Sequence, residues 1–152
     1  MHAVLRSNSG EAEIGIQFGA ATEYAHDPGF ESRLELKGCH WDGDHTFPFS
    51  TTIDGLWLRA DDLEALRDHI AKWVSLPMNE LVSDGLTRCF QLARLPGQRL
   101  SVQFGPRSDL VSGPNPVVSI VFSAGKLSGE FHFVTDQSCL NLFAHELQAS
   151  LL

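Results

Sequence analysis

The stretch Asp61–Leu76 (DDLEALRDHIAKWVSL) decides most of what this sequence says about its fold. Its apolar residues recur at helical spacing and form one stripe: Leu63, Leu66, Ile70, Trp73 and Val74. Asp61, with Glu64 three residues later, predicts a capping box at the start. Leu76 precedes a proline, which disfavours the helical conformation, so we expect an amphipathic helix over residues 61–76.

A second amphipathic helix is predicted at the C-terminal end, over residues 136–151. Its apolar side chains also fall on one face: Leu140, Phe143, Ala144, Leu147 and Leu151. Either Thr135 or Asp136 is suited to cap its first turn. Helices of this length are marginally stable alone in water, so both stripes must pack against a larger element, which we expect to be a sheet.

Most of the remaining chain alternates apolar and polar residues with the period of a β-strand. The segments with this pattern are Glu13–Gly19, Phe30–Lys37, Thr46–Ile53, Leu56–Arg59, Thr87–Leu95, Arg99–Gly105, Val117–Ala124 and Leu127–Thr135. Pro48 cannot donate a hydrogen bond to a neighbouring strand, which favours a sheet edge or a bulge at that position.

Turn-forming residues separate these segments. Asp27-Pro28-Gly29 predicts a turn that closes a polar connection. Glycines flank the polar residues between Gly38 and Asp44, which predicts a hairpin tip there. Gly125-Lys126 lies between two alternating segments and predicts a two-residue hairpin turn.

The order of strands, helix, strands and helix indicates an α+β fold. We expect a mostly antiparallel β-sheet or sandwich of about seven to eight strands that carries both helices. A chain of 152 residues, 43% of them hydrophobic, has the size and composition of a single domain over residues 1–152 with a substantial core. Within it, the small polar run Arg6–Glu11 favours flexibility over residues 1–11.

The formal net charge of −8 and the presence of only three lysines argue against nucleic-acid binding, which depends on basic side chains. An acidic surface is compatible with a basic protein partner. Cys39, Cys89 and Cys139 form no C-x-x-C pair, and no segment has the pattern of a signal peptide or a membrane span. We therefore expect a cytoplasmic protein.

The cluster His40-Trp41-Asp42-Gly43-Asp44-His45 is the strongest candidate for chemistry. His40, Asp42, Asp44 and His45 supply the nitrogen and oxygen ligands that a transition metal prefers, and glycine allows a loop to wrap around an ion. The spacing matches no established motif, and the same residues also suit a solvated turn. A metal site and a solvated turn both stay open.

Other candidates for catalysis are weaker. His132 is expected on the outward face of a strand, and His69 at the edge of the first helix stripe. His145-Glu146 begins like a zinc-protease helix, but Ala149 stands where the second histidine is needed. No serine-nucleophile elbow or phosphate-binding loop occurs, so we expect neither a catalytic residue nor a cofactor.

Leu56–Leu76, a short strand followed by D-D-L-x-x-L-x-x-x-I-x-x-W, resembles the small bacterial immunity-protein families of the WapI type. Phe131–Leu147 (F-x-F-x-T-D-Q-x-x-L-x-x-F-A-x-E-L) is similar to the terminal strand and helix of these families. The resemblance covers mainly residues 56–147, at core and cap positions. It implies a small acidic cytoplasmic protein that neutralises a toxin by binding it, and it assigns no functional residue.

Three functions follow from these observations. The first is a non-enzymatic protein-binding module with a basic partner, such as a toxin domain. The second is a metal-binding protein or metal-dependent enzyme that uses the segment His40–His45. The third is a self-associating structural domain that uses the edge near Pro48 or an exposed helix face, which leaves a homo-oligomer open.

Overall fold

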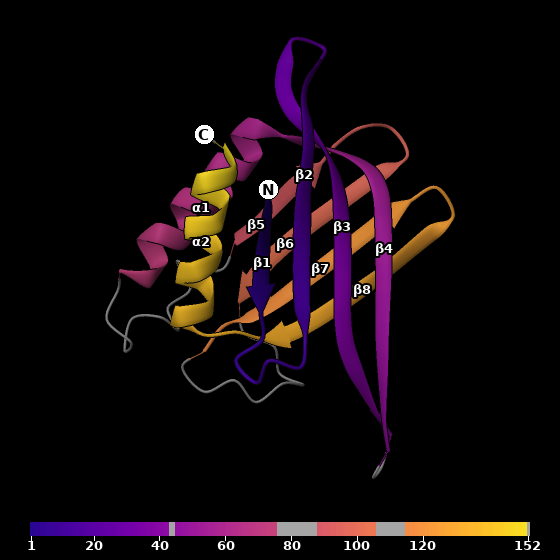
Figure 1. Ribbon diagram of the computed structural model, residues 1–152, viewed down its shortest axis with the longest axis vertical. Coiled ribbons are helices and arrows are strands. Elements are labelled where there is room, and N and C mark those ends of the chain that lie inside the picture. The colour runs from indigo at the N-terminus through magenta and orange to yellow at the C-terminus, as the bar shows by residue number, and fades with distance from the viewer. Residues whose placement is uncertain (43–44, 76–87, 106–114, 152) are drawn as a thin grey trace.

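The computed structural model describes residues 1–42, 45–75, 88–105 and 115–151, with the backbone alone for residues 40–42 and 45–47. The elements are β1 (His2–Arg6), β2 (Glu13–Tyr24), β3 (Asp27–Asp42), β4 (His45–Arg59), α1 (Ala60–Val74), β5 (Arg88–Ala93), β6 (Gln98–Gly105), β7 (Val117–Ala124), β8 (Leu127–Val134) and α2 (Gln137–Leu151) (Figure 1). The chain therefore forms four strands and a helix, twice. The predicted α+β fold is confirmed.

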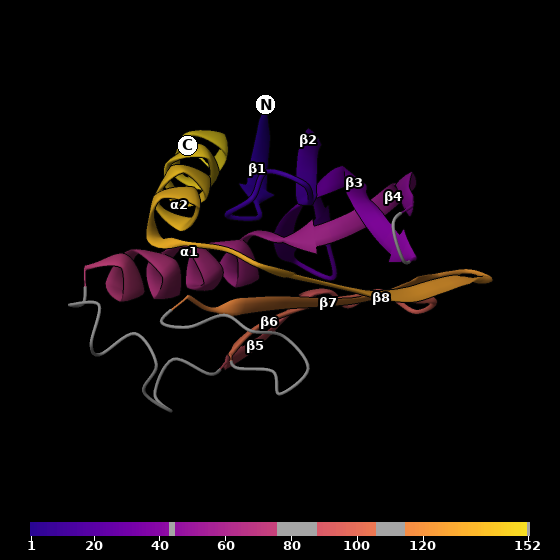
Figure 2. The ribbon, with the colours of Figure 1, turned by 90° about the horizontal axis from the view of Figure 1, so that it is seen from below.

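The described strands form one antiparallel sheet in which each strand pairs with its neighbours in sequence. Strands β4 and β5 share a single pair, Leu58 with Ala93. At this bridge the sheet folds over, so that β1–β4 form one layer and β5–β8 form a second layer across it (Figure 2). The two predicted alternatives, sheet and sandwich, are thus combined in one structure.

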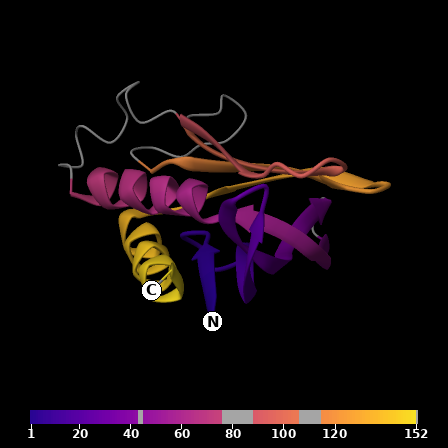
Figure 3. The same cartoon turned by 90° about the horizontal axis from the view of Figure 1, so that it is seen from above.

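The two helices close one side of these layers (Figure 3). Helix α1 contacts β3, β4 and β5, and α2 packs against α1 and β1. The predicted stripes are buried: Leu63, Leu66, Ile70 and Trp73 in α1, and Leu140, Phe143, Ala144 and Leu147 in α2. They join the inward side chains of the strands in one apolar cluster, so the helices complete the core.

The two helices begin in different ways. Helix α1 starts at Ala60, because β4 continues directly into it, and its N-cap residue Arg59 makes no side-chain capping bond. The capping box predicted at Asp61 is therefore wrong. Asp61 already lies in the first turn, where its negative charge interacts favourably with the helix dipole. In α2 the predicted cap is confirmed, since the Asp136 carboxylate accepts a 2.8 Å hydrogen bond from the Cys139 N–H.

The turn between β2 and β3 lies at Ala25-His26, and the predicted turn at Asp27-Pro28-Gly29 is wrong. Tyr24 pairs with Asp27, and both intervening residues have positive φ, 51° and 71°, as a type I′ hairpin requires. Gly29 lies inside β3 and serves close packing instead. A Cβ atom at that position would lie 2.6 Å from the Leu58 carbonyl oxygen.

Gly38 also lies inside β3, so the hairpin tip predicted from residue 38 is wrong. It pairs with Phe49, and a Cβ atom there would lie 3.0 Å from the rings of Phe49 and Phe131. The strands continue to the pair Asp42–His45. Between β7 and β8, the predicted two-residue turn is confirmed, because Ala124 pairs with Leu127 and Gly125 has a φ of 61°.

The N-terminal segment expected to favour flexibility contains a strand. Residues 2–6 form β1, and the polar run after it is a hydrogen-bonded turn in which the Ser7 N–H donates to the Ala12 carbonyl at 2.8 Å. Pro48 pairs with Cys39 on one side only, since β4 meets β5 at Leu58 alone among the described strands. The edge predicted at Pro48 is confirmed.

The Ala25-His26 turn yields a stability prediction. A non-glycine residue at positive φ costs about 1 kcal/mol or more, whereas Asn-Gly adopts the type I′ turn readily. The double substitution Ala25→Asn with His26→Gly is expected to stabilise the protein by about 1 kcal/mol, measured by urea unfolding. Gly125→Ala, at a φ of 61°, is the matched control and should destabilise. A loss of stability in the Asn-Gly variant would contradict the turn assignment.

Candidate functional site

His132 lies in a hydrogen-bonded cluster on the outer face of β7 and β8. It pairs across the strands with Ser119, and its Nδ1 lies 2.9 Å from the Ser119 Oγ. Its Nε2 lies 3.3 Å from Oε2 of Glu130, two residues earlier on the same face. Phe131 and Phe133 are buried on the opposite face, as the alternation predicted. The imidazole is thus held between a hydroxyl and a carboxylate.

Ser119 did not emerge from the sequence analysis, although a signal for it exists. A two-residue turn at Gly125-Lys126 pairs Ala124 with Leu127 and so sets every later pair of the hairpin. Ser119 lies five residues before Ala124, and His132 lies five residues after Leu127. Counting outward from the turn therefore places the two side chains opposite each other.

A serine, a histidine and a carboxylate are the groups used in nucleophilic catalysis, which also needs donors aimed at a developing oxyanion. The backbone N–H groups of β7 point within the sheet, toward β6 and β8, with which β7 pairs along its whole length. They are not aimed out of the face that carries Ser119. The cluster orients an imidazole without a backbone oxyanion site beside it.

The predicted metal ligands fall mainly outside the described residues. Asp44 is outside the described backbone, and the side chains of His40, Asp42 and His45 are outside the described part as well. The backbone places Asp42 opposite His45 at the end of the β3–β4 hairpin. Within the residues that the structure describes, no three histidines, cysteines or carboxylates gather as a metal-binding group. A metal site at His40–His45 stays a prediction.

Glu146 has a structural contact with the edge of the sheet. Its Oε2 accepts a 2.7 Å hydrogen bond from the Val4 N–H of β1. This N–H points away from β2, so α2 covers the outer edge of β1. His145 lines a shallow groove between α1 and α2, where Asp68 and Gln148 are among its neighbours. Glu146 thus protects an edge strand.

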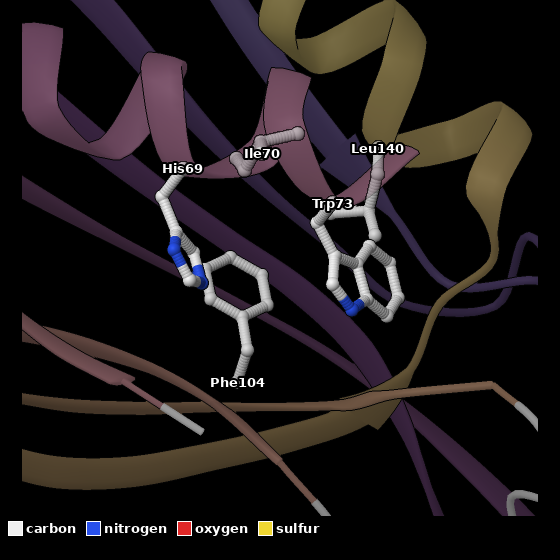
Figure 4. Close-up of a pocket in the computed structure, with 5 residues that line it drawn as sticks. All are labelled: His69, Ile70, Trp73, Phe104 and Leu140. Carbon is white, nitrogen blue, oxygen red and sulfur yellow. The ribbon is translucent and has the colours of Figure 1, made fainter. Parts of the chain in front are cut away.

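A small cavity lies between α1, α2 and β6 (Figure 4). Its lining residues are His69, Ile70, Trp73, Phe104 and Leu140. The His69 ring lies 5.2 Å from the Phe90 ring, in agreement with the packing position expected for it. The Trp73 Nε1–H is buried and has no hydrogen-bond partner among the described residues.

This cavity is too small for an organic ligand. The volume open to the centre of a water molecule is about 10 Å³. This is close to the minimum volume that one ordered water needs. Its walls are mostly apolar, and Leu140 is fully buried. The cavity is therefore a packing feature at the junction of the helices with the second layer.

Leu140→Ala tests this view of the cavity. Removal of the buried side chain should enlarge the cavity and destabilise the protein by about 2–5 kcal/mol in chemical unfolding. Leu142→Ala, at an exposed position of the same helix, is the matched control and should change stability little. Equal effects of the two substitutions would contradict the packing role of Leu140.

The tip of the β2–β3 hairpin and the start of α1 lie at the same end of the molecule (Figure 1), and together they carry five carboxylates, which we name the acidic end. It consists of Glu23, Asp27, Asp61, Asp62 and Glu64. Arg59 contacts two of them, Asp27 at 3.4 Å and Asp61 at 3.2 Å, and Arg94 contacts Asp62 at 2.8 Å. The two guanidinium groups thus pair with three of the five carboxylates, Asp27, Asp61 and Asp62.

Tyr24 lies at the acidic end, where it follows Glu23 and pairs with Asp27, and its exposed fraction is 50%. Its ring lies 5.8 Å from the ring of Trp57, which is buried. The Trp57 Nε1–H donates a 3.1 Å hydrogen bond to the Thr22 hydroxyl, and the ring covers Gly29. The exposed Tyr24 ring therefore packs against a buried tryptophan that is fixed by a hydrogen bond.

The three cysteines differ in their surroundings. Cys39 and Cys89 are exposed, whereas Cys139 is partly buried at the start of α2. Burial, together with the hydrogen bond to Asp136, raises the pKa of the Cys139 thiol. A raised pKa lowers the thiolate fraction at a given pH, and the thiolate is the reactive form.

Alkylation of the native protein with iodoacetamide should therefore modify Cys39 and Cys89 before Cys139, as followed by mass spectrometry. The Cys139 rate should keep rising at pH values above the ordinary thiol pKa, because its own pKa is raised. Asp136→Asn removes one cause of the shift and should speed the reaction. Uniform rates at all three thiols would contradict the assigned environment.

Comparison with known proteins assigns no family. The chain matches no family model and no curated protein. Among solved structures it is similar to the plant transcriptional regulator PBF-2, with a TM-score of 0.49 and 10% identity, over 99% of this chain and 80% of that chain. A likeness at this level carries no functional argument. No helix in the described part of the chain has the length and apolar character to cross a membrane.

Proposed function

We propose that this protein is a non-enzymatic protein-binding module that binds a basic partner through the acidic end. The observation that supports this function is the exposed Tyr24, whose ring packs against Trp57 and which lies beside the carboxylates of Glu23 and Asp27. Tyrosine and tryptophan are among the side chains that contribute most binding energy at protein interfaces. Charges of one sign near such an anchor favour partners of the opposite charge.

The charges of the acidic end favour a cationic partner. Arg59 and Arg94 are engaged with neighbouring carboxylates, while Glu23 and Glu64 are exposed and make no ion pair with the described residues. These two carboxylates can pair with a partner without breaking an internal contact. The net charge of −8 adds a long-range attraction that speeds association at low salt.

The resemblance of residues 56–147 to WapI-type immunity proteins adds the class of partner to this proposal. A toxin domain with a basic surface has the charge that the acidic end attracts. In this proposal the protein acts in the cytoplasm and inhibits the toxin by occupying its surface. No catalytic step by this chain is required.

Affinity capture on immobilised protein, with partners identified by mass spectrometry and then purified, tests the function. Tyr24→Ala should weaken binding of the purified partner by about tenfold or more in calorimetry, because the aromatic anchor is lost. Glu64→Lys should weaken it mainly through slower association, and the effect should diminish at high salt.

Glu11→Lys is the matched control for the charge change. Glu11 is exposed in the β1–β2 connection, at the opposite end of the layer from the start of α1 (Figure 1). The Glu11→Lys substitution changes the net charge by the same amount as Glu64→Lys, and binding of the partner should be nearly unchanged. A partner that binds the wild type and the Tyr24→Ala variant equally would show that the acidic end is not the binding face.

A further inference from the structure

Strand β8 ends the described sheet with a regular edge that no described strand pairs from Ser128 to His132, while the Val134 carbonyl at its end is bonded to Asn8. It pairs with β7 over all of its eight residues without a shift of register, and no described strand pairs with its other side. Leu127 closes the two-residue turn, so alternate residues from it onward bond to β7. The N–H and C=O groups of Ser128, Glu130 and His132 therefore point outward, as the Val134 carbonyl does when it accepts a 2.9 Å bond from the Asn8 N–H.

The other end of the sheet is protected, which makes the β8 edge distinctive. Helix α2 lies against β1, and the Glu146 carboxylate accepts a hydrogen bond from the outward N–H of Val4. Along β8, the edge has no bulge, no proline and no lysine, three of the devices that prevent edge-to-edge pairing, and Glu130 is its one acidic residue. Strand β4, by contrast, carries Pro48 on its exposed edge.

Apolar side chains flank the β8 edge. Leu127, at the start of the strand, is 45% exposed, and Phe49 of β4 is 41% exposed. The Phe49 ring lies 5.5 Å from the ring of Phe131, at the centre of β8. A strand added along β8 would lie beside these side chains and shield them from water.

We propose that the strand that pairs with this edge is β8 of a second copy of the chain, antiparallel and centred on Phe131. In this register Glu130 lies opposite His132 of the second copy, and His132 lies opposite its Glu130. Both residues have outward backbone groups, so they form hydrogen-bonded pairs across the interface. The result is an isologous dimer in which the β5–β8 layers of two copies form one continuous sheet.

The pairing of a carboxylate with an imidazole favours both the second copy and the register. Glu130 and His132 already lie side by side on one strand, at 3.3 Å. In the dimer each His132 imidazole lies between the Glu130 carboxylates of the two copies, so that carboxylates and imidazoles alternate over the outer face. A register centred on Glu130 would oppose two carboxylates, which is unfavourable. The Ser119 hydroxyl holds the imidazole in place for this contact.

This inference is independent of the proposed function, because the acidic end is formed by other elements. Sedimentation velocity over a concentration series should show a reversible dimer for the wild type. Glu130→Lys should weaken the dimer by about tenfold, because both cross-strand pairs lose their attraction. The double variant Glu130→Lys with His132→Glu restores opposite partners and should recover most of the affinity.

The backbone contribution is tested at the same position. Glu130→Pro removes an outward N–H and no bond to β7, so the fold should persist while the dimer is lost. Glu130→Ala keeps the N–H and should weaken the dimer only partly. Glu64→Lys makes the same charge change on α1, outside the β5–β8 layer, and should not alter the dimer. If Glu130→Pro proves unfolded by circular dichroism, the charge-exchange pair of variants still decides the question.

Three results would overturn the proposal. The first is a monomer at every accessible concentration of the wild type. The second is a dimer that neither Glu130→Lys nor a folded Glu130→Pro variant weakens, which would locate the interface elsewhere. The third is a dimer that Glu130→Lys weakens and the double variant does not restore, which would exclude the register centred on Phe131.

Discussion

The burial of one face of α1 is the constraint on which the rest of this structure depends. Backbone hydrogen bonds do little to join the two layers, since β4 and β5 share only the pair of Leu58 with Ala93. Helix α1 contacts strands of both layers, and Leu63 and Leu66 are fully removed from water. Burial of a leucine contributes about 1.5–3 kcal/mol, more than the net gain from one backbone hydrogen bond. Side-chain packing therefore holds the layers together.

The same constraint determines which surfaces the molecule presents. Because β4 continues into α1 without a loop, the first turn of the helix carries its carboxylates to the β2–β3 hairpin tip. Because α2 must pack on α1, it also lies against β1 and covers that edge. Strand β8 is followed by α2, but among the described elements no helix covers its outer edge. One end of the sheet is thus closed, and the other carries unpaired backbone groups.

Close approach of strands explains two glycines for which the sequence predicts turns. Gly29 allows Trp57 to lie against β3, and Gly38 allows the rings of Phe49 and Phe131 to meet above it. Both glycines resemble turn residues in sequence, because glycine favours turns and tight packing alike. The turn between β2 and β3 instead uses Ala25-His26, a dipeptide with no turn signature. Its conformation follows from the pairing of two long strands on either side.

Periodicity in the sequence determined the α+β class, the two helix stripes and the hairpin turn at Gly125-Lys126, because these depend on residues near one another in the chain. The Asp136 cap was predictable for the same reason. Only the tertiary structure decided that the sheet folds into two layers at Leu58, and that the exposed Tyr24 packs against Trp57 and lies opposite Asp27. These features depend on which residues distant in sequence come into contact. The alternation of apolar and polar residues in a strand determines which face is buried, but not which strands lie beside it.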